Sequence, residues 1–354
     1  MRILCITPYG KTKTPEMGFA ELLSNNGHEI TLLLTDYDIS KLTIHEEILH
    51  KEFDVIWGMM EYAIPTAVTY GKLLNKPVLG HIECIPPWRI SIEDNRQWGF
   101  DYPEGLGETV NVVNFKKMYL LLVNYFDKCD EKTISGDSWR YTFKGLTGIE
   151  TDAKTRYYTF DKTDSEKYAN SLLKMNKQIC TISRFTPLKR VHHIIKALSL
   201  IPIENRPKYK LIGYGEQQIY LMRLAKELGV EVEFLGDGDN GLKYKTIQES
   251  AFNVEISSGI PVLEAASLNR FTLAYEEPHM KEVYRDICVW TERNNIEKLA
   301  LEIEKHINNL SLCEELGREA KRKMLLVCDT SKFVADVEKY LLSAIENFNN
   351  KGGK

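Results

Sequence analysis

Short apolar runs alternate with amphipathic stretches along the first half of the chain. Runs typical of buried strands lie at residues 3–6, 30–34, 55–57, 77–81, 132–134 and 156–160. Stretches with helical spacing lie between the early runs, at 16–26 and 64–74, and Gly27 follows the first of them as a cap residue. This alternation is typical of βαβ units, so we predict a parallel sheet covered by helices on both faces.

A second series of the same kind follows the polar segment 161–178. Its predicted strands lie at 179–183, 209–212, 230–235, 253–256 and 271–274. Helical patterns with one apolar face lie between them, and a last such pattern lies at 331–348. We therefore predict an α/β protein with two doubly wound domains, residues 1–165 and 166–328. A C-terminal helix within 329–354 is expected to pack back toward the first domain.

Composition and charge exclude several classes of protein. With 354 residues, 43% hydrophobic and 27% charged, the chain has the composition of an ordinary globular protein. Its formal net charge of -4 gives no support to a nucleic-acid-binding function. The seven cysteines have no CxxC or metal-type spacing, which predicts reduced thiols and no metal site. We find no signal-peptide pattern and no apolar span long enough to cross a bilayer, so we expect a cytoplasmic protein.

Candidate ligand-binding residues follow the predicted strands of the second half. Arg184 and Lys189 flank a Pro187 turn that leads into a helix. Two cations beside free helix N–H groups favour a pyrophosphate clamp, with a solvated basic turn as an equal alternative. Gly213 and Gly215 end the next strand and allow a backbone to approach a nucleotide or phosphate closely, although ordinary turn chemistry explains them as well.

A further candidate is SSGIPVLEAASLN, residues 257–269. Its turn and apolar helix start comprise Gly259, Ile260, Pro261 and Val262. Glu264 lies in the first helical turn. Its carboxylate either complements the positive end of the helix dipole or binds hydroxyl groups of an anionic ligand held at the helix start.

The order and spacing of these segments resemble a known family. SRFTPLKRVHHIIKAL, YKLIGYGE, EVEFLG and SSGIPVLEAASLN are together similar to the C-terminal domain of retaining glycosyltransferases of family 4. Those enzymes have the GT-B fold, in which two Rossmann-like, doubly wound domains face a central cleft. FAELLSNNGHEITLLL and CDEKTISGD are similar, less specifically, to the family's N-terminal elements, and EEPHMKEV places Glu282 where the family often has Pro-Glu-Val. The resemblance covers nearly the whole chain.

The resemblance implies roles for individual residues. Arg184 and Lys189 would bind the donor diphosphate, and Glu264 would bind the ribose hydroxyls. His81, at the end of the fourth predicted strand, would face the donor sugar. The ordinary explanation of a lone histidine is a core or strand-end residue whose ring nitrogens are hydrogen-bonded within the protein. The remaining nucleotide-sugar contacts implied in this way are Gly10, Gly213, Gly215, Gly259, Ile260, Pro261 and Val262.

One position departs from the family. In the family a second glutamate, eight positions before the ribose-binding one, contacts the transferred sugar, and here that position is Ile256. Glu255 is adjacent, but in a strand over 253–256 the side chains of 255 and 256 point to opposite faces, so Glu255 is not a simple replacement. The departure puts recognition of the sugar in question, rather than recognition of the nucleotide.

Two N-terminal segments need a separate interpretation. TPYGKTKT contains Gly10-Lys11-Thr12, but a P-loop requires glycine where the chain has Cys5, so we reject that motif and place Gly10 in a loop that faces the cleft. The aromatic and basic segment 86–126 lies where the family usually binds acceptor. A core helix with a solvated rim is favoured there over a peripheral membrane contact.

The sequence thus predicts a retaining, metal-independent glycosyltransferase without a cofactor. Its donor would be a UDP- or GDP-linked sugar, and its acceptor a glycan, a lipid-linked molecule or a small molecule. The main alternative is a catalytically silent nucleotide-sugar-binding protein of the same fold, which Ile256 motivates. A sugar-epimerase-like enzyme is a further alternative, whereas a Rossmann dehydrogenase is disfavoured because no GxGxxG follows the first strand.

Overall fold

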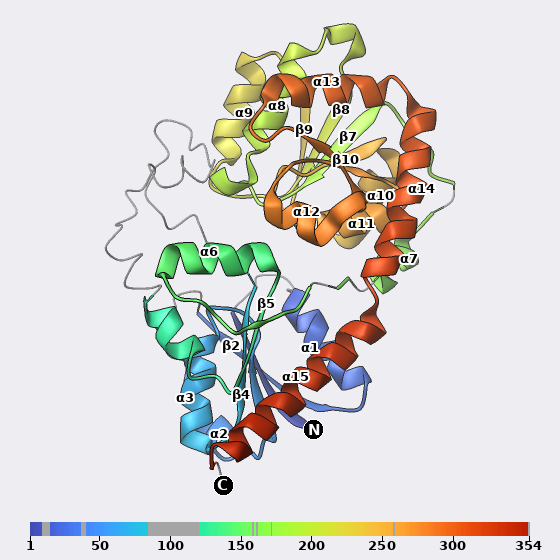
Figure 1. Cartoon of the computed structure of the whole chain (residues 1–354). Helices are drawn as coiled ribbons and strands as arrows, with labels where there is room; N and C mark the ends of the chain where they lie inside the picture. The colour runs from blue at the N-terminus through green and yellow to red at the C-terminus, as the bar shows by residue number, and fades with distance from the viewer. Residues whose placement is uncertain are drawn as a thin grey trace. The chain divides into compact units, whose positions relative to one another are not determined.

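The computed structural model describes residues 1–8, 15–36, 40–83, 120–157, 159–160, 162–170, 172–257 and 259–352. These residues form two compact units, and each is described by itself (Figure 1). The amino-terminal unit contains the described residues of 1–83, 120–159 and 330–352, and the carboxy-terminal unit contains those of 160–329.

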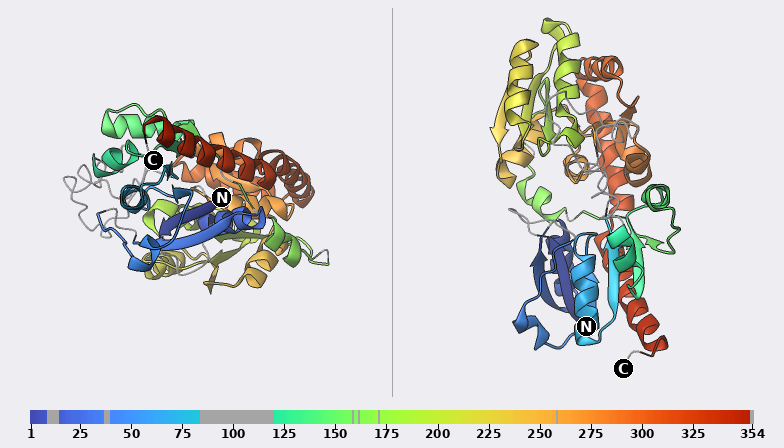
Figure 2. Two further views of the ribbon diagram at one scale, coloured as in Figure 1. Left: turned by 90° about the horizontal axis from the view of Figure 1, so that it is seen from below. Right: turned by 90° about the vertical axis from the view of Figure 1, so that its left-hand side faces the viewer.

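A six-stranded parallel sheet with the order β2-β1-β3-β4-β5-β6 forms the centre of the amino-terminal unit. Its strands are β1 (Arg2–Pro8), β2 (Glu29–Thr35), β3 (Val55–Gly58), β4 (Val78–Ile82), β5 (Glu131–Ile134) and β6 (Lys154–Thr155). Its helices include α1 (Pro15–Asn25), α2 (Glu46–Leu49), α3 (Ile64–Leu74), α6 (Asp137–Thr147) and α15 (Thr330–Asn350). Figure 2 shows the sheet and these helices from two further directions.

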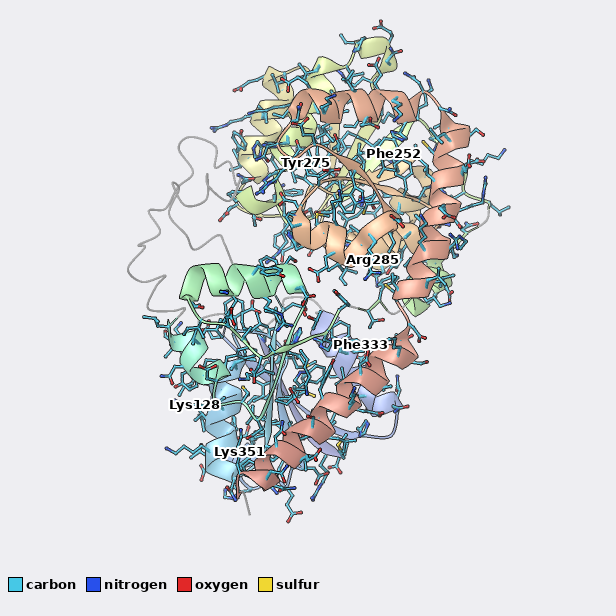
Figure 3. The ribbon with its side chains drawn as sticks, in the orientation of Figure 1. Lys128, Phe252, Tyr275, Arg285, Phe333 and Lys351 are labelled. Carbon is cyan, nitrogen blue, oxygen red and sulfur yellow. The ribbon has the colours of Figure 1, made fainter. Side chains whose placement is uncertain are left out.

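The C-terminal helix α15 packs on the sheet of the amino-terminal unit. It lies against β3, β4 and β5 and touches α1 (Figure 1). The ring of Phe333, labelled in Figure 3, is 4.6 Å from the ring of Phe19 on α1, and Val337, Leu341 and Ala344 are buried in the same core. The apolar side that the sequence pattern assigns to this helix is therefore the side that contacts the sheet.

The carboxy-terminal unit has a second six-stranded parallel sheet, with the order β12-β11-β10-β7-β8-β9. Its strands are β7 (Gln178–Ile182), β8 (Lys208–Ile212), β9 (Val232–Gly236), β10 (Phe252–Val254), β11 (Thr272–Tyr275) and β12 (Cys288–Thr291). Its α-helices are α7 (Thr163–Tyr168), α8 (Val191–Leu200), α9 (Gln218–Glu227), α10 (Asn240–Glu249), α11 (Pro261–Ser267), α12 (Pro278–Tyr284), α13 (Ile296–Ile307) and α14 (Leu310–Val327). Three 3-10 turns, at 187–189, 203–205 and 285–287, complete the described elements of this unit.

The predicted α/β architecture of two doubly wound parallel sheets is confirmed. One predicted strand, at 156–160, is wrong, because β6 consists of Lys154 and Thr155 and pairs with β5 only at these residues. Arg156 follows with a buried side chain whose guanidinium lies 5.0 Å from the ring of Phe333. Among the described residues, none of the helices is both long enough and apolar enough to cross a membrane.

Candidate active site

The strand order of the carboxy-terminal unit indicates where its sheet can bind a ligand. From β7 the chain proceeds to β8 and β9 on one side and then returns to β10 on the other side of β7. The carboxyl ends of β7 and β10 therefore form a switch point, the place at which open α/β sheets bind ligands. The segments that leave these two strands, 183–190 and 255–260, contain several of the predicted donor-binding residues.

Lys189 lies at this switch point with its ammonium next to a buried carboxylate. Its Nζ is 3.6 Å from Oε1 of Glu255, and the two side chains are 14% and 1% exposed. The same ammonium borders Gly259, since a Cβ placed on that glycine would lie 3.6 Å from Nζ. Lys189 thus connects the loop after β7 with the loop after β10.

A buried ion cluster supports the turn that carries Lys189. The next residue, Arg190, is fully buried and has a left-handed backbone with a φ of 47°. Its Nη1 donates to Oε1 of Glu277 at 2.8 Å, and Nε of Arg293 lies 3.1 Å from the same oxygen. Burial lowers the pKa of Arg190, and the Glu277 carboxylate opposes that change. A residue with a side chain holds this φ only where its surroundings fix it, so the cluster gives Lys189 a rigid support.

The structure corrects the expected strand over 253–256. β10 ends at Val254, and Ile256, 1% exposed, packs into the hydrophobic core of the unit. Glu255 is the residue whose carboxylate lies toward Lys189. Burial raises the pKa of Glu255 to about 7, and the Lys189 ammonium limits this rise. A carboxyl group is therefore present one position before the one at which the family resemblance expects it.

Arg184, the other predicted diphosphate-binding cation, has a different environment. Its side chain is exposed and makes no hydrogen bond or ion pair with any residue that the structure describes. Its carbonyl oxygen accepts a hydrogen bond from the amide of Thr186 at 2.9 Å, which shapes the turn. Lys189 is therefore already held by a carboxylate, whereas Arg184 extends into solvent.

The predicted glycine turn packs against the loop after β7. Gly213 has a φ of 135°, and a Cβ there would lie 1.9 Å from the carbonyl oxygen of Ser183. A Cβ on Gly215 would lie 2.5 Å from the carbonyl oxygen of Phe185. The amide of Phe185 donates to the carbonyl oxygen of Tyr214 at 2.9 Å. Glycine is thus required at both positions because two backbone segments touch here. The turn positions the loop that leads to the switch point.

Glu264 lies in the first turn of α11 and is 6% exposed. Its Oε1 accepts hydrogen bonds from Nζ of Lys243 at 2.6 Å and from the hydroxyl of Tyr244 at 3.4 Å. Lys243 is not among the residues predicted from the sequence, because no spacing rule connects a lysine on one helix with a glutamate on the next. The available signal was its place in the first turn of the helix that follows β9, at the carboxyl edge of the sheet.

The start of α11 is fixed by its own turn. The amide of Val262 donates to the carbonyl oxygen of Gly259 at 3.2 Å, and the amide of Glu264 donates to Ile260 at 3.0 Å. Pro261 has no N–H, and the hydroxyl of Tyr284 donates to the carbonyl oxygen of Gly259 at 3.1 Å. This helix start therefore offers an anion fewer N–H groups than a regular one does.

His81 belongs to the amino-terminal unit, and its ring is fully buried. Its Nδ1 lies 2.8 Å from the hydroxyl of Thr133, and its Nε2 lies 3.0 Å from both Oε2 of Glu83 and the hydroxyl of Ser135. Burial, and then the charge of Arg156, lower the pKa of His81 to about 4, against the opposing effect of Glu83. Both ring nitrogens contact protein groups, as the strand-end explanation requires. The role of His81 toward a donor sugar stays a prediction.

Two predictions concern segments that fall outside the described residues. Gly10 is one, and most of the segment 86–126 is the other. The described end of that segment, 120–126, is helical, with Leu122, Val123 and Phe126 buried as expected of a core helix. Within the described ranges, no three His, Cys, Asp or Glu side chains are grouped so that they could hold a metal ion.

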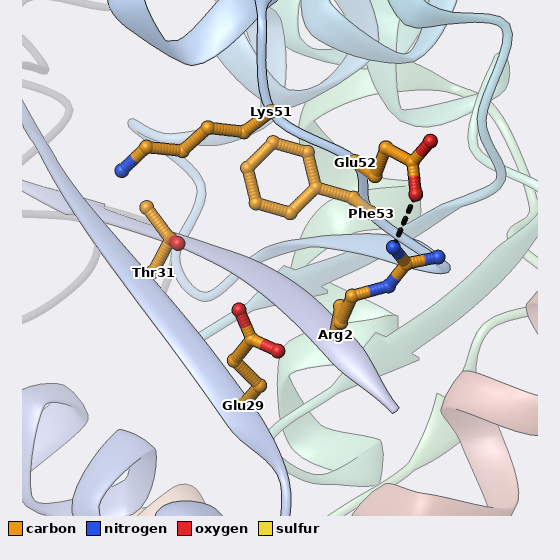
Figure 4. Close-up of a pocket in the computed structure, with 6 residues that line it drawn as sticks. All are labelled: Arg2, Glu29, Thr31, Lys51, Glu52 and Phe53. Atoms are coloured by element: carbon orange, nitrogen blue, oxygen red, sulfur yellow. Dashed lines mark hydrogen bonds and ion pairs between the residues drawn. The ribbon is translucent and has the colours of Figure 1, made fainter.

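Two cavities lie elsewhere on the described surface. One, of about 390 Å³, is at the amino ends of β1, β2 and β3 and is lined by Arg2, Glu29, Thr31, Lys51, Glu52 and Phe53 (Figure 4). Another, of about 640 Å³, is lined by Leu173, Lys174, Met175, Asn269, Arg270, Glu314 and Arg318. Neither cavity contains a predicted site residue. Arg2 is paired with Glu52 and Asp54, and Arg270 donates to the carbonyl oxygens of Ser250 and Asn269, so these cations are already engaged.

Comparison with known proteins gives a family match for one of the two units. Residues 162–323, which lie in the carboxy-terminal unit, match the family described as Glycosyl transferases group 1. No curated protein sequence matches the chain.

Several solved structures have the same fold. Alr3699/HepE from Anabaena, solved in complex with UDP-glucose, is 16% identical with a TM-score of 0.72, and the match covers 97% of this chain and 100% of that chain. Sucrose-phosphate synthase from Thermosynechococcus elongatus is 11% identical with a TM-score of 0.70, over 96% of this chain and 97% of that chain. A glycosyltransferase from Rickettsia africae is 13% identical with a TM-score of 0.67, over 98% of this chain and 99% of that chain. The chain has the GT-B fold of these glycosyltransferases.

Proposed function

We propose that the protein is a glycosyltransferase that moves a sugar from a nucleoside diphosphate sugar to an acceptor hydroxyl, with retention at the anomeric carbon. The observation that carries this proposal is the arrangement of Lys189 beside Glu255 at the switch point of the unit that matches the glycosyltransferase family. Glu264 lies on the helix that the same loop enters. A diphosphate requires a cation, a sugar hydroxyl can bind a carboxyl group, and the ribose hydroxyls can bind a second carboxylate.

Each residue has a defined task in this reaction. The difficult step is departure of the nucleoside diphosphate while positive charge develops at the anomeric carbon. Lys189 and Arg184 would bind the diphosphate and stabilise the charge that gathers on it, an electrostatic role that needs no metal ion and no cofactor. Glu264 would accept hydrogen bonds from the ribose. Lys189 is held in place before the ligand arrives, and Arg184 is free to close on it.

Glu255 is the residue that we assign to the transferred sugar. A fully ionised carboxylate next to a diphosphate would repel it, but burial raises the pKa of Glu255 to about 7. Near neutral pH the carboxyl group can therefore carry a proton and donate a hydrogen bond to a sugar hydroxyl. This assignment also removes the main motive for a catalytically silent protein, which was the lack of a carboxylate at Ile256.

A UDP-sugar is the first donor to test, since HepE, a protein of the same fold, was crystallised with UDP-glucose. The acceptor that we propose is a hydroxyl of a glycan, a lipid-linked molecule or a small molecule. Thermal melting with UDP, GDP and ADP would identify the nucleotide, because a ligand that binds only the folded state raises the Tm. Transfer is then measured with the corresponding sugar nucleotides and a panel of acceptors. Nucleotide binding without hydrolysis or transfer of any donor would support the silent binding protein instead.

A further inference from the structure

Lys243 has a side-chain environment that the proposed reaction does not yet use. Its ammonium lies 2.6 Å from Oε1 of Glu264, and the two side chains are 17% and 7% exposed. The same ammonium lies 4.5 Å from the centre of the Tyr244 ring, and the Tyr244 hydroxyl also contacts Oε1 of Glu264. The lysine is therefore held by an ion pair and a cation–π contact together.

The local fold gives Lys243 little freedom. Asp239 caps α10 by accepting a hydrogen bond from the amide of Leu242 at 2.7 Å, which fixes the first turn of the helix. The ring of Tyr244 is buried and packs at 5.6 Å from the ring of Tyr168 on α7. The ammonium of Lys243 is consequently held between the Tyr244 ring on its own helix and the Glu264 carboxylate on α11.

The two contacts leave the carboxylate of Glu264 asymmetric. Lys243 and Tyr244 both contact Oε1, and Oε2 accepts no hydrogen bond from any residue that the structure describes. The oxygens of a carboxylate accept hydrogen bonds. A vicinal diol presents two O–H donors, so a carboxylate with one oxygen available suits it.

We propose that Lys243 is a positioning residue for nucleotide recognition, which orients Glu264 so that Oε2 is presented to the ribose hydroxyls of the donor. The inference rests on the proposed function, because it takes Glu264 as the ribose-binding carboxylate. Lys243 itself need not touch the nucleotide. Its contribution is to hold the Glu264 carboxylate in one orientation, so that the carboxylate does not have to be ordered when the ligand binds.

The test compares ribonucleotides with their 2′,3′-dideoxy analogues. Affinities of the full-length chain are measured for UDP, GDP and ADP and for the three matching dideoxy nucleotides, in wild-type protein and in Lys243→Met. We expect the wild-type protein to bind the cognate ribonucleotide about tenfold more tightly than its dideoxy analogue, on the scale of a hydrogen bond to a charged group. In Lys243→Met this ratio should fall close to one, with the loss confined to the ribonucleotide.

Lys245→Met is the matched control, since Lys245 lies on the same helix with a 59% exposed side chain, and its ion pair with a described residue is a 3.9 Å contact to Glu249. It should keep the wild-type ratio. If Lys243→Met does not fold, the same ratio is measured in Lys243→Gln, where a fall is again expected.

Three results would overturn the inference, and they differ from one another. An unchanged ratio in the variant would show that Glu264 does not depend on Lys243. An equal loss for ribonucleotide and dideoxynucleotide would assign Lys243 a merely structural role. Absence of binding of all six nucleotides to the wild-type protein would overturn the proposed function of the site, and with it this inference.

Discussion

The ammonium of Lys189 lies 3.6 Å from the carboxylate of Glu255, and these two residues come from loops that leave neighbouring strands of the carboxy-terminal sheet. Lys189 is the only cation within 4 Å of that carboxylate among the described residues. Because Glu255 is 1% exposed, water contributes little to its solvation. Its protonation is therefore balanced between the cost of burying a charge and the attraction of one ammonium.

Glu255→Gln should change the pH dependence of stability. The pKa of Glu255 is raised from 4.5 to about 7, so the carboxyl group is protonated in both states below pH 4.5, and its contribution to stability is complete there. As pH rises through about 7, the unfolded state has already lost its proton and the contribution disappears, a change of about 3 kcal/mol. The free energy of unfolding, measured by urea denaturation from pH 4.5 to 8, should therefore fall more in the wild-type protein than in the variant.

Glu276→Gln is the control for this experiment, because Glu276 is 50% exposed and pairs with Lys281 at the surface. Its pH profile should follow that of the wild-type protein. Parallel profiles for wild-type and Glu255→Gln would contradict the environment described for Glu255.

Arg184→Ala and Lys189→Ala should each reduce sugar transfer by about a hundredfold, the scale on which loss of one preorganised charge partner acts. The two variants should differ in stability. Removing Lys189 leaves the buried Glu255 without its cation and should lower the Tm above pH 7, whereas removing the exposed Arg184 should leave the Tm nearly unchanged.

Lys208→Ala separates these effects from a general loss of positive charge. Lys208 is an exposed lysine at the amino end of β8, the opposite edge of the same sheet. Transfer by this variant should match the wild-type rate. Wild-type rates in both Arg184→Ala and Lys189→Ala would show that the diphosphate is bound elsewhere.

Gly213→Ala should destabilise the carboxy-terminal unit by about 3 kcal/mol or more. A Cβ at this position would lie 1.9 Å from the carbonyl oxygen of Ser183, and the φ of 135° is strained for alanine. The backbone of the β7 loop would have to move, so transfer should fall together with the Tm. Differential scanning calorimetry and the transfer assay measure the two effects.

Gly145→Ala provides the contrast. Gly145 lies within α6 and a Cβ there would meet no atom within 4 Å, so alanine should raise helix stability by about 0.5–1 kcal/mol. A Tm of Gly213→Ala that equals the wild-type value would mean that the two loops do not touch in solution.

The fold was predictable from the sequence because periodicity reports burial directly. The apolar runs at 3–6 and 179–183 correspond to β1 and β7, and both sheets are parallel, as the alternation of strands and helices requires. The strand predicted at 156–160 does not form. Arg156, the first residue of that segment, is buried, and its guanidinium packs on the ring of Phe333. A side chain with an aromatic partner from the far end of the chain has no local signature.

The candidate site was predictable in part. Lys189, Gly213 and Glu264 stand in recognisable turns, and the structure gives each of them a defined environment. The environments of two residues could not be predicted from the sequence, for different reasons. The side of the chain on which Glu255 lies depends on where β10 ends, and a shift of one residue reverses it. The contact of Lys243 with Glu264 depends on how two successive helices pack, which no spacing encodes.

His81→Gln should alter stability in acid. The pKa of His81 is lowered from 6.5 to about 4, so its contribution to stability is complete above pH 6.5 and is lost as pH falls toward 4, because the unfolded state then takes up a proton that the buried ring does not. That loss is about 3 kcal/mol and should be smaller in the variant, as measured by urea denaturation between pH 4 and 8. His50→Gln, at an exposed histidine of the same unit, should reproduce the wild-type profile.

Transfer measured at pH 8, where the ring is neutral in both states, then distinguishes the two explanations of His81. If the ring only forms hydrogen bonds with Thr133, Glu83 and Ser135, any loss of turnover in His81→Gln should be accompanied by a fall in the Tm. A large loss of turnover with an unchanged Tm would instead support contact with the donor sugar. Thr133→Val removes the hydrogen-bond partner of Nδ1 and leaves the His81 ring in place. At pH 8 this variant should show the same effect on the Tm as His81→Gln, and any contact of the ring with the sugar should remain.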